Sequence, residues 1–151
     1  MKSFLYICLL SLIGCSSFSE TSIKIKYVKT EIDSNHDLIL RFDANKDFSQ
    51  RTGNQLGSYV YCLLDKSQNL NADSFVPNFE MDALSGTIPR NDAALFNKEK
   101  KLYEYQVILM RTMQSTSKVL EDNISCKVFT SKISGGFEKS NTITIPIGIL
   151  K

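Results

Sequence analysis

Histidine is the side chain best suited to exchange protons near neutral pH, and this chain of 151 residues contains one, His36. It lies in the polar stretch Asn35-His36-Asp37, which is typical of a turn. A Ser-His-Asp mechanism would have to use it, yet the chain has no G-x-S-x-G pattern that would present a nucleophilic serine. We therefore interpret His36 as a solvated turn residue and expect no catalytic residue and no enzymatic activity.

Oxygen-bearing side chains alternate at Asp43, Asn45 and Asp47, a spacing that matches the start of an EF-hand calcium loop. The rest of the loop does not match, because Phe48 stands where the sharp turn needs glycine and Asn54 stands where a bidentate glutamate is needed. An EF-hand is excluded. We expect a plain polar connection without a bound metal or other cofactor, and a looser calcium site at these three residues is the alternative.

Two pairs of tyrosines, Tyr59 with Tyr61 and Tyr103 with Tyr105, have the spacing of side chains on one face of a strand. Exposed aromatic rings of this kind can stack on sugar rings or on a protein partner. Tyrosines that alternate along strands more often pack a sheet face, with their hydroxyl groups at its rim. We expect these residues to belong to the core.

The N-terminal residues carry the most specific motif of the chain. An apolar run follows Lys2 and is well short of the roughly 20 residues that span a bilayer. It ends in Leu12-Ile13-Gly14-Cys15, which resembles the lipobox of bacterial lipoproteins. The resemblance implies that residues 1–14 are a cleaved signal peptide and that Cys15 becomes an acylated N-terminus, with acyl chains that hold the protein on a membrane.

Ser16 follows the lipobox cysteine, with no aspartate at that position. This resembles lipoproteins that a Gram-negative cell sends to its outer membrane. The expected location is therefore the cell envelope, with the protein facing the periplasm. The alternative is an ordinary secretory signal that is cleaved a few residues later, which would leave a secreted protein without a lipid.

The four cysteines separate into different roles if the chain is exported. Cys8 leaves with the signal peptide and Cys15 takes the lipid, so Cys62 and Cys126 remain as a pair in an oxidising compartment. Both lie within apolar, strand-like segments. We expect them to form a buried disulfide, and two buried free thiols are the alternative.

Three regions follow: the signal peptide 1–14, the lipidated N-terminus and tether 15–21, and a single domain 22–151. The chain has 18 basic and 16 acidic residues, and removal of Lys2 leaves 17 and 16. A charge of about +1 gives no electrostatic argument for a nucleic-acid partner.

Apolar residues alternate with polar ones through most of the chain after the N-terminal region, which is the pattern of half-buried strands. Six segments show it clearly: 23–27, 38–42, 59–64, 102–113, 124–133 and 142–149. The length of the fourth segment suggests a bulge or a bend. Ser134-Gly135-Gly136 indicates a turn before the last strand, and Pro146 indicates that this strand lies at an edge or a bulge.

Residues 65–100 lose this alternation but retain large apolar side chains, so they are not a disordered linker. We expect one or two short strands between Phe79 and Ile88 and a helical turn between Asn91 and Phe96. About seven strands with a buried disulfide predict an all-β fold, an antiparallel β-sandwich of immunoglobulin-like build. The chain has no tryptophan to pack on the disulfide, and Ile124 replaces the tyrosine that antibody-type domains carry two residues before the second cysteine.

The expected function is that of a membrane-anchored, non-enzymatic envelope lipoprotein that binds a protein partner. Small lipoproteins of this build include accessory subunits of envelope machines and immunity-type inhibitors of periplasmic toxins. Binding needs shape and a few anchoring side chains rather than a catalytic group. The alternative is a secreted module that binds carbohydrate or calcium. The sequence leaves the partner-binding residues open and only suggests the 65–100 segment as a variable surface.

Overall fold

The computed structural model describes residues 23–48, 55–64, 67–89, 95–112 and 122–148. Within these ranges the chain forms strands, turns and connections without an α-helix, so no described helix is long and apolar enough to cross a membrane. The strands are β1 (Ile25–Ile32), β2 (Leu38–Ala44), β3 (Gln55–Leu63), β4 (Ala83–Thr87), β5 (Leu95–Asn97), β6 (Leu102–Arg111), β7 (Asn123–Lys132), β8 (Phe137–Lys139) and β9 (Ile143–Pro146).

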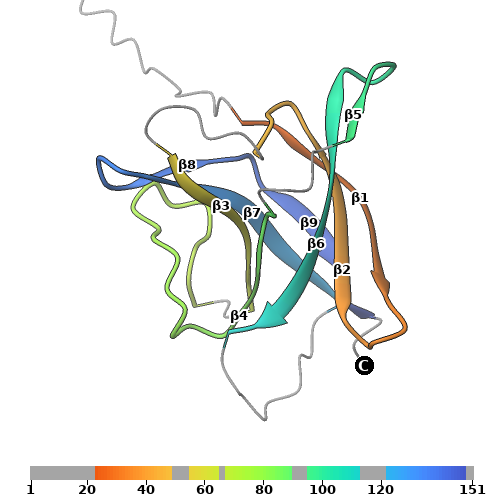
Figure 1. Ribbon diagram of the computed structural model, residues 1–151. Helices are drawn as coiled ribbons and strands as arrows, with labels where there is room; N and C mark the ends of the chain where they lie inside the picture. The colour runs from red at the N-terminus through yellow and green to blue at the C-terminus, as the bar shows by residue number, and fades with distance from the viewer. Residues whose placement is uncertain (1–22, 49–54, 65–66, 90–94, 113–121, 149–151) are drawn as a thin grey trace, which may run out of the picture.

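These strands form the two layers of an antiparallel sandwich (Figure 1). One layer is β1-β2-β6, with the short β5 on the other edge of β6. The second layer is β4-β3-β7, with β8 and β9 following each other along the free edge of β7. The predicted antiparallel β-sandwich is confirmed, and each of the six segments predicted from alternation contains a strand, although the last one is a strand only from Ile143 to Pro146.

Strand β6 belongs to both layers, which explains its length. It pairs with β2 from Tyr103 to Leu109 without a register shift, and it then pairs with β4 at Met110 and Arg111. The β2–β6 pairing therefore does not contain the bulge that the length of β6 suggested. Register shifts occur instead in β1, between Tyr27 and Lys29, and at the start of β3.

The other side of the sandwich is closed where β1 meets the start of β9. Ile23 forms a parallel bridge with Ser140. The side-chain amide of Asn141 then forms the two hydrogen bonds that a neighbouring strand would form with Ile25. Its Oδ1 accepts from the Ile25 N–H at 2.6 Å, and its Nδ2 donates to the Ile25 carbonyl at 3.0 Å. A strand edge that would otherwise be unpaired is thereby satisfied.

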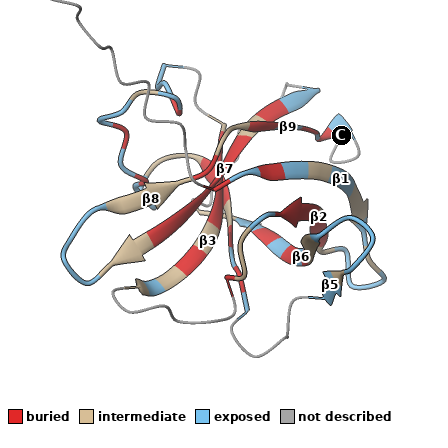
Figure 2. Ribbon diagram, turned by 90° about the horizontal axis from the view of Figure 1, so that it is seen from above, coloured by how far each residue is buried: buried red, intermediate tan, exposed pale blue. Residues whose placement is uncertain are grey.

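Alternate residues of the strands fill the space between the layers, as their period of two requires (Figure 2). This core is made of the inward-facing residues Ile23, Ile25, Leu38, Leu40, Phe42, Ala44, Val60, Leu84, Tyr105, Val107, Leu109, Ile124, Val128, Ile143, Ile145 and Ile147, among others. Cys62 and Cys126 are part of it, and both are fully buried.

A second apolar cluster lies on the outer face of the β4-β3-β7 layer. Tyr61 and Phe129 point outward from the strands, and residues of the connection that follows β3 cover them, including Leu70 and Phe75. The rings of Tyr61 and Phe75 are 5.9 Å apart. This connection explains why residues 67–82 carry large apolar side chains without alternating: they form a cover instead of a strand.

In the rest of the 65–100 segment, a short strand was predicted correctly and a helical turn was not. Strand β4 is one of the expected short strands between Phe79 and Ile88. The expected helical turn between Asn91 and Phe96 is wrong at its end, because residues 95–97 are strand β5, paired with β6. Residues 91–94 lie outside the described residues.

Candidate partner-binding surface

The predicted disulfide forms between Cys62 and Cys126. The two residues lie directly opposite each other on the neighbouring strands β3 and β7, with their Cα atoms 4.0 Å apart. In antibody-type domains the corresponding bridge joins the two sheets. Here it joins two neighbouring strands of one sheet, so it cross-links strands within a layer and not the two layers. The predicted lipidation residue, Cys15, lies outside the described residues.

His36 is an exposed residue of the turn between β1 and β2. Its N–H donates to the carbonyl of Asp33, and its φ of 67° places it in the left-handed region. The Asp33 carboxylate holds the same turn, since it accepts from the N–H groups of Asn35 and Asp37, both at 2.9 Å. The described contacts of His36 are those of a turn residue.

The three weak calcium candidates contact three different partners. Asp43 is buried and forms an ion pair with Lys100 at 3.3 Å. Asn45 Oδ1 accepts from the N–H of Lys24 at 2.8 Å, and Asp47 accepts from the Tyr105 hydroxyl at 3.3 Å. All three therefore take part in contacts around the end of β2.

The paired tyrosines differ in burial. Tyr61 and Tyr105 are buried, one in the outer cluster and one in the core, while Tyr59 and Tyr103 are partly exposed. Burial raises the pKa of Tyr59 to about 12 and also raises the pKa of Tyr105. The expectation of core packing is confirmed for Tyr61 and Tyr105.

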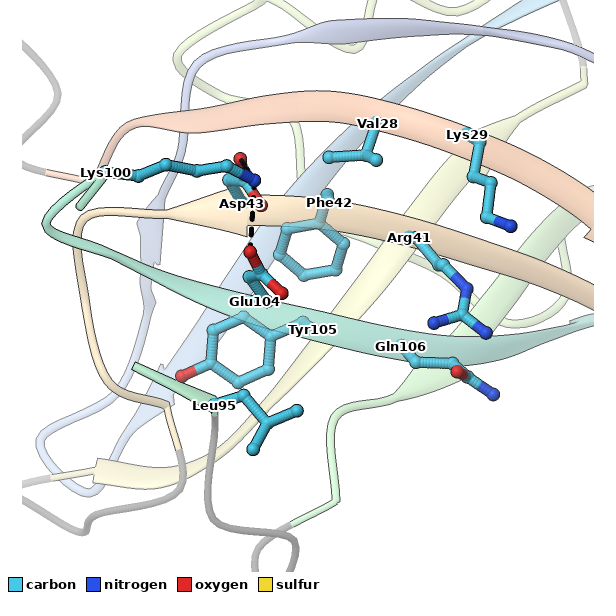
Figure 3. Close-up of a pocket in the computed structure, with 10 residues that line it drawn as sticks. All are labelled: Val28, Lys29, Arg41, Phe42, Asp43, Leu95, Lys100, Glu104, Tyr105 and Gln106. Carbon is cyan, nitrogen blue, oxygen red and sulfur yellow. Dashed lines mark hydrogen bonds and ion pairs between the residues drawn. The ribbon is translucent and has the colours of Figure 1, made fainter. Parts of the chain in front are cut away.

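A groove with a volume of about 320 Å³ lies on the outer face of β1-β2-β6 (Figure 3). The strands contribute mainly residues that alternate with the core, together with the core residues Phe42 and Tyr105, and β5 adds one rim, beyond which the β5–β6 turn projects (Figure 1). The groove is lined by Val28, Lys29, Arg41, Phe42, Asp43, Leu95, Lys100, Glu104, Tyr105 and Gln106.

At one end of the groove two cations are neighbours. Lys29 on β1 lies directly opposite Arg41 on β2, an unfavourable pairing by itself. Glu31 resolves it, because one carboxylate oxygen accepts from Lys29 Nζ at 2.5 Å and the other accepts from Arg41 Nε at 2.8 Å. The hydrogen bonds from Lys29 and Arg41 hold the pKa of Glu31 below its usual value.

At the other end two carboxylates are neighbours. Asp43 on β2 lies opposite Glu104 on β6, and Lys100 bridges them at 3.3 Å and 3.0 Å. Asn97 also donates to Glu104 at 2.9 Å. The pKa of Glu104 is lowered by Asn97 and Lys100, and the pKa of Lys100 is raised by Glu104 and Asp43. Each like-charged pair thus shares one opposite charge.

Apolar side chains border these charges. Val28 is 46% exposed and lies at the bulge of β1, while Leu95 on β5 is 74% exposed. Further along the same face of β6, Ile108 and Met110 are exposed at 45% and 67%. Exposed apolar groups next to oriented charges are what an interface provides, and a rigid sheet holds them in place.

The sequence contains little that would have identified this groove. Arg41 and Glu104 occupy the outward positions of alternating segments, where charged residues are ordinary. Their significance depends on which strands are neighbours and in which register, and that information is not present in the local pattern. A weak signal exists, since Leu95 and Phe96 are large apolar residues beside a charged turn at 98–101.

Together, fold and surface define a disulfide-bonded antiparallel β-sandwich with a charged groove on one sheet. No known family model, curated protein or solved structure matches this chain.

Proposed function

We propose that this protein is a lipid-anchored, non-enzymatic protein of the bacterial envelope that binds a protein partner through the groove on β1-β2-β6. The groove carries the proposal, because it combines oriented charges with exposed Val28 and Leu95 on a rigid sheet. Such a surface suits recognition of a protein by an accessory subunit or by an immunity-type inhibitor of a periplasmic toxin.

One structural observation supports the envelope location. The Cys62–Cys126 disulfide fits an oxidising compartment outside the cytosol.

Mass spectrometry of the N-terminus tests the anchor. We expect the protein to start at Cys15 with the added mass of a diacylglycerol and an amide-linked acyl chain, and we expect it in the membrane fraction. A Cys15→Ser variant should lose both the added mass and the membrane association. An unmodified N-terminus beyond residue 15 in the wild type would contradict the anchor and would favour a secreted module.

Site-directed photo-crosslinking tests the binding half of the same proposal. A photoreactive amino acid in place of Gln106 would stand in the groove, and one in place of Thr144 would stand on an exposed position of β9. We expect one distinct protein to crosslink from position 106 and not from position 144. Equal crosslinking from both positions, or none from position 106, would contradict binding through this groove.

A further inference from the structure

The side chain of Arg41 is held in place by one hydrogen bond, and some of its donors remain available. Its Nε donates to Glu31, which positions the guanidinium. An arginine has five N–H donors, and its two terminal nitrogens form a planar fork that matches a carboxylate. Within the described part of the chain these terminal nitrogens have no hydrogen-bond partner. Figure 3 shows that the side chain extends from β2 toward Gln106 on β6.

The surroundings of the fork add a second donor and an apolar contact. Gln106 lies directly opposite Arg41 in the β2–β6 register and is exposed. Among the described residues its amide has no hydrogen-bond partner either. Val28 and Leu95 also line the groove, so an apolar group next to a bound carboxylate would find apolar side chains there.

The charges of this face favour an anionic group at the Arg41 end. Lys29 and Arg41 share the single carboxylate of Glu31, which leaves one uncompensated positive charge. At the opposite end the charges balance, because the two carboxylates joined by Lys100 also face an exposed lysine, Lys26, which is opposite Asp43.

We propose that Arg41 binds the side-chain carboxylate of an aspartate or glutamate in an extended segment of the partner, with an adjacent apolar residue of that segment against Val28 or Leu95. This inference rests on the proposed function and names the chemistry of its partner. An internal acidic residue fits better than a chain terminus, because β2 lies between β1 and β6 and a segment can continue past Arg41 on both sides.

Glu31 is a positioning residue in this arrangement. By accepting from Nε it orients the guanidinium plane, and it leaves the fork free to form two parallel hydrogen bonds. A lysine at position 41 would carry the same charge as the arginine but would lack the planar fork. The Arg41→Lys variant therefore separates bidentate recognition from simple electrostatic attraction.

The test uses the protein as purified from cells and two matched probes, N-acetyl-Glu-Leu-amide and N-acetyl-Gln-Leu-amide, followed by ¹H–¹⁵N NMR titration. We expect the acidic probe to shift the Arg41 Nε–H and Gln106 side-chain signals and to bind at least about tenfold more tightly than the neutral probe. Arg41→Gln should abolish this preference and Arg41→Lys should weaken binding several-fold. Lys132→Gln, the same charge change on β7, should leave binding unchanged.

Three results would overturn the inference. They are the absence of shifts up to about 10 mM of the acidic probe, equal binding of both probes, and unchanged affinity in Arg41→Lys. Tighter binding of N-acetyl-Gln-Leu with a free C-terminal carboxylate would assign the fork to a chain terminus and would also overturn it. If position 106 crosslinks one partner while the probes fail, the proposed function stands and only the carboxylate inference falls.

Discussion

At the scale of single residues, Lys127 carries a charged group that is largely buried. It points outward from β7, opposite Tyr61, yet it is only 8% exposed. Burial lowers its pKa, repulsion from Lys139 lowers it further, and attraction to Asp73 opposes both effects. The folded protein therefore binds this proton less tightly than the unfolded chain does, so the charge on Lys127 destabilises the fold at neutral pH.

The Lys127→Met variant should accordingly be more stable than the wild type at pH 7, by about 1 kcal/mol in the free energy of unfolding. A lowered pKa means that wild-type stability rises with pH between the folded value and the ordinary value of 10.5, so the difference should shrink toward pH 10. Urea unfolding at both pH values measures this. Lys132→Met, on the same strand but at a partly exposed position, is the control, and a destabilised Lys127→Met would contradict the argument.

Single residues were predictable where their chemistry is local. The expected Cys62–Cys126 disulfide is present, whereas Cys8 and Cys15 lie outside the described residues and their roles stay predictions. The roles of Asp43 and Asp47 were not predictable in this way. Their partners, Lys100 and Tyr105, lie more than fifty residues away and meet them only because β2 pairs with β6.

At the scale of elements, the junction between the two layers depends on a close approach of β4 to β6. Gly86 lies on β4 where a Cβ atom would stand 2.1 Å from the carbonyl oxygen of Ile108 and 2.5 Å from Val107 Cγ1. No real side chain fits at such distances, so the absence of a Cβ atom allows β6 to continue from one sheet into the other.

Substitution of this glycine tests the junction. Gly86→Ala should force β4 and β6 apart and lower the free energy of unfolding by about 1–3 kcal/mol, the usual effect of overpacking. Gly148→Ala is a matched control, since a Cβ there would meet nothing within 4 Å. Chemical denaturation of both variants measures the difference. Equal stabilities would show that β4 and β6 can separate without cost and would contradict the close approach.

Elements were predictable where one face of a strand meets the core and the other meets solvent. The segments at 38–42 and 102–113 alternate for this reason and became β2 and β6. Residues 67–82 do not alternate, because Leu70 and Phe75 cover a sheet from outside. Strand β5 is only three residues long and is defined by its pairing with β6, so its local pattern could not distinguish it from a helical turn.

At the scale of the whole molecule, the sandwich is closed on one side by the shared strand β6 and on the other by Asn141, which joins β1 to the start of β9. Several of its neighbouring strands are distant in sequence, as in the β2–β6 and β3–β7 pairs. Pairings of this kind require long loops to close before any contact forms, so a cross-link between distant strands has a large effect on the unfolded chain.

The Cys62–Cys126 bridge is such a cross-link, with a sequence separation of 64 residues. In the chain-entropy model, its reduction should lower the free energy of unfolding by about 4 kcal/mol, a large part of the roughly 5–15 kcal/mol typical of a domain. Urea unfolding with and without a reductant measures this loss without a substitution. A variant with both Cys62→Ala and Cys126→Ala should not respond to the reductant, which isolates the effect of the bridge. An unchanged midpoint for the reduced wild type would mean that strand pairing alone holds β3 against β7.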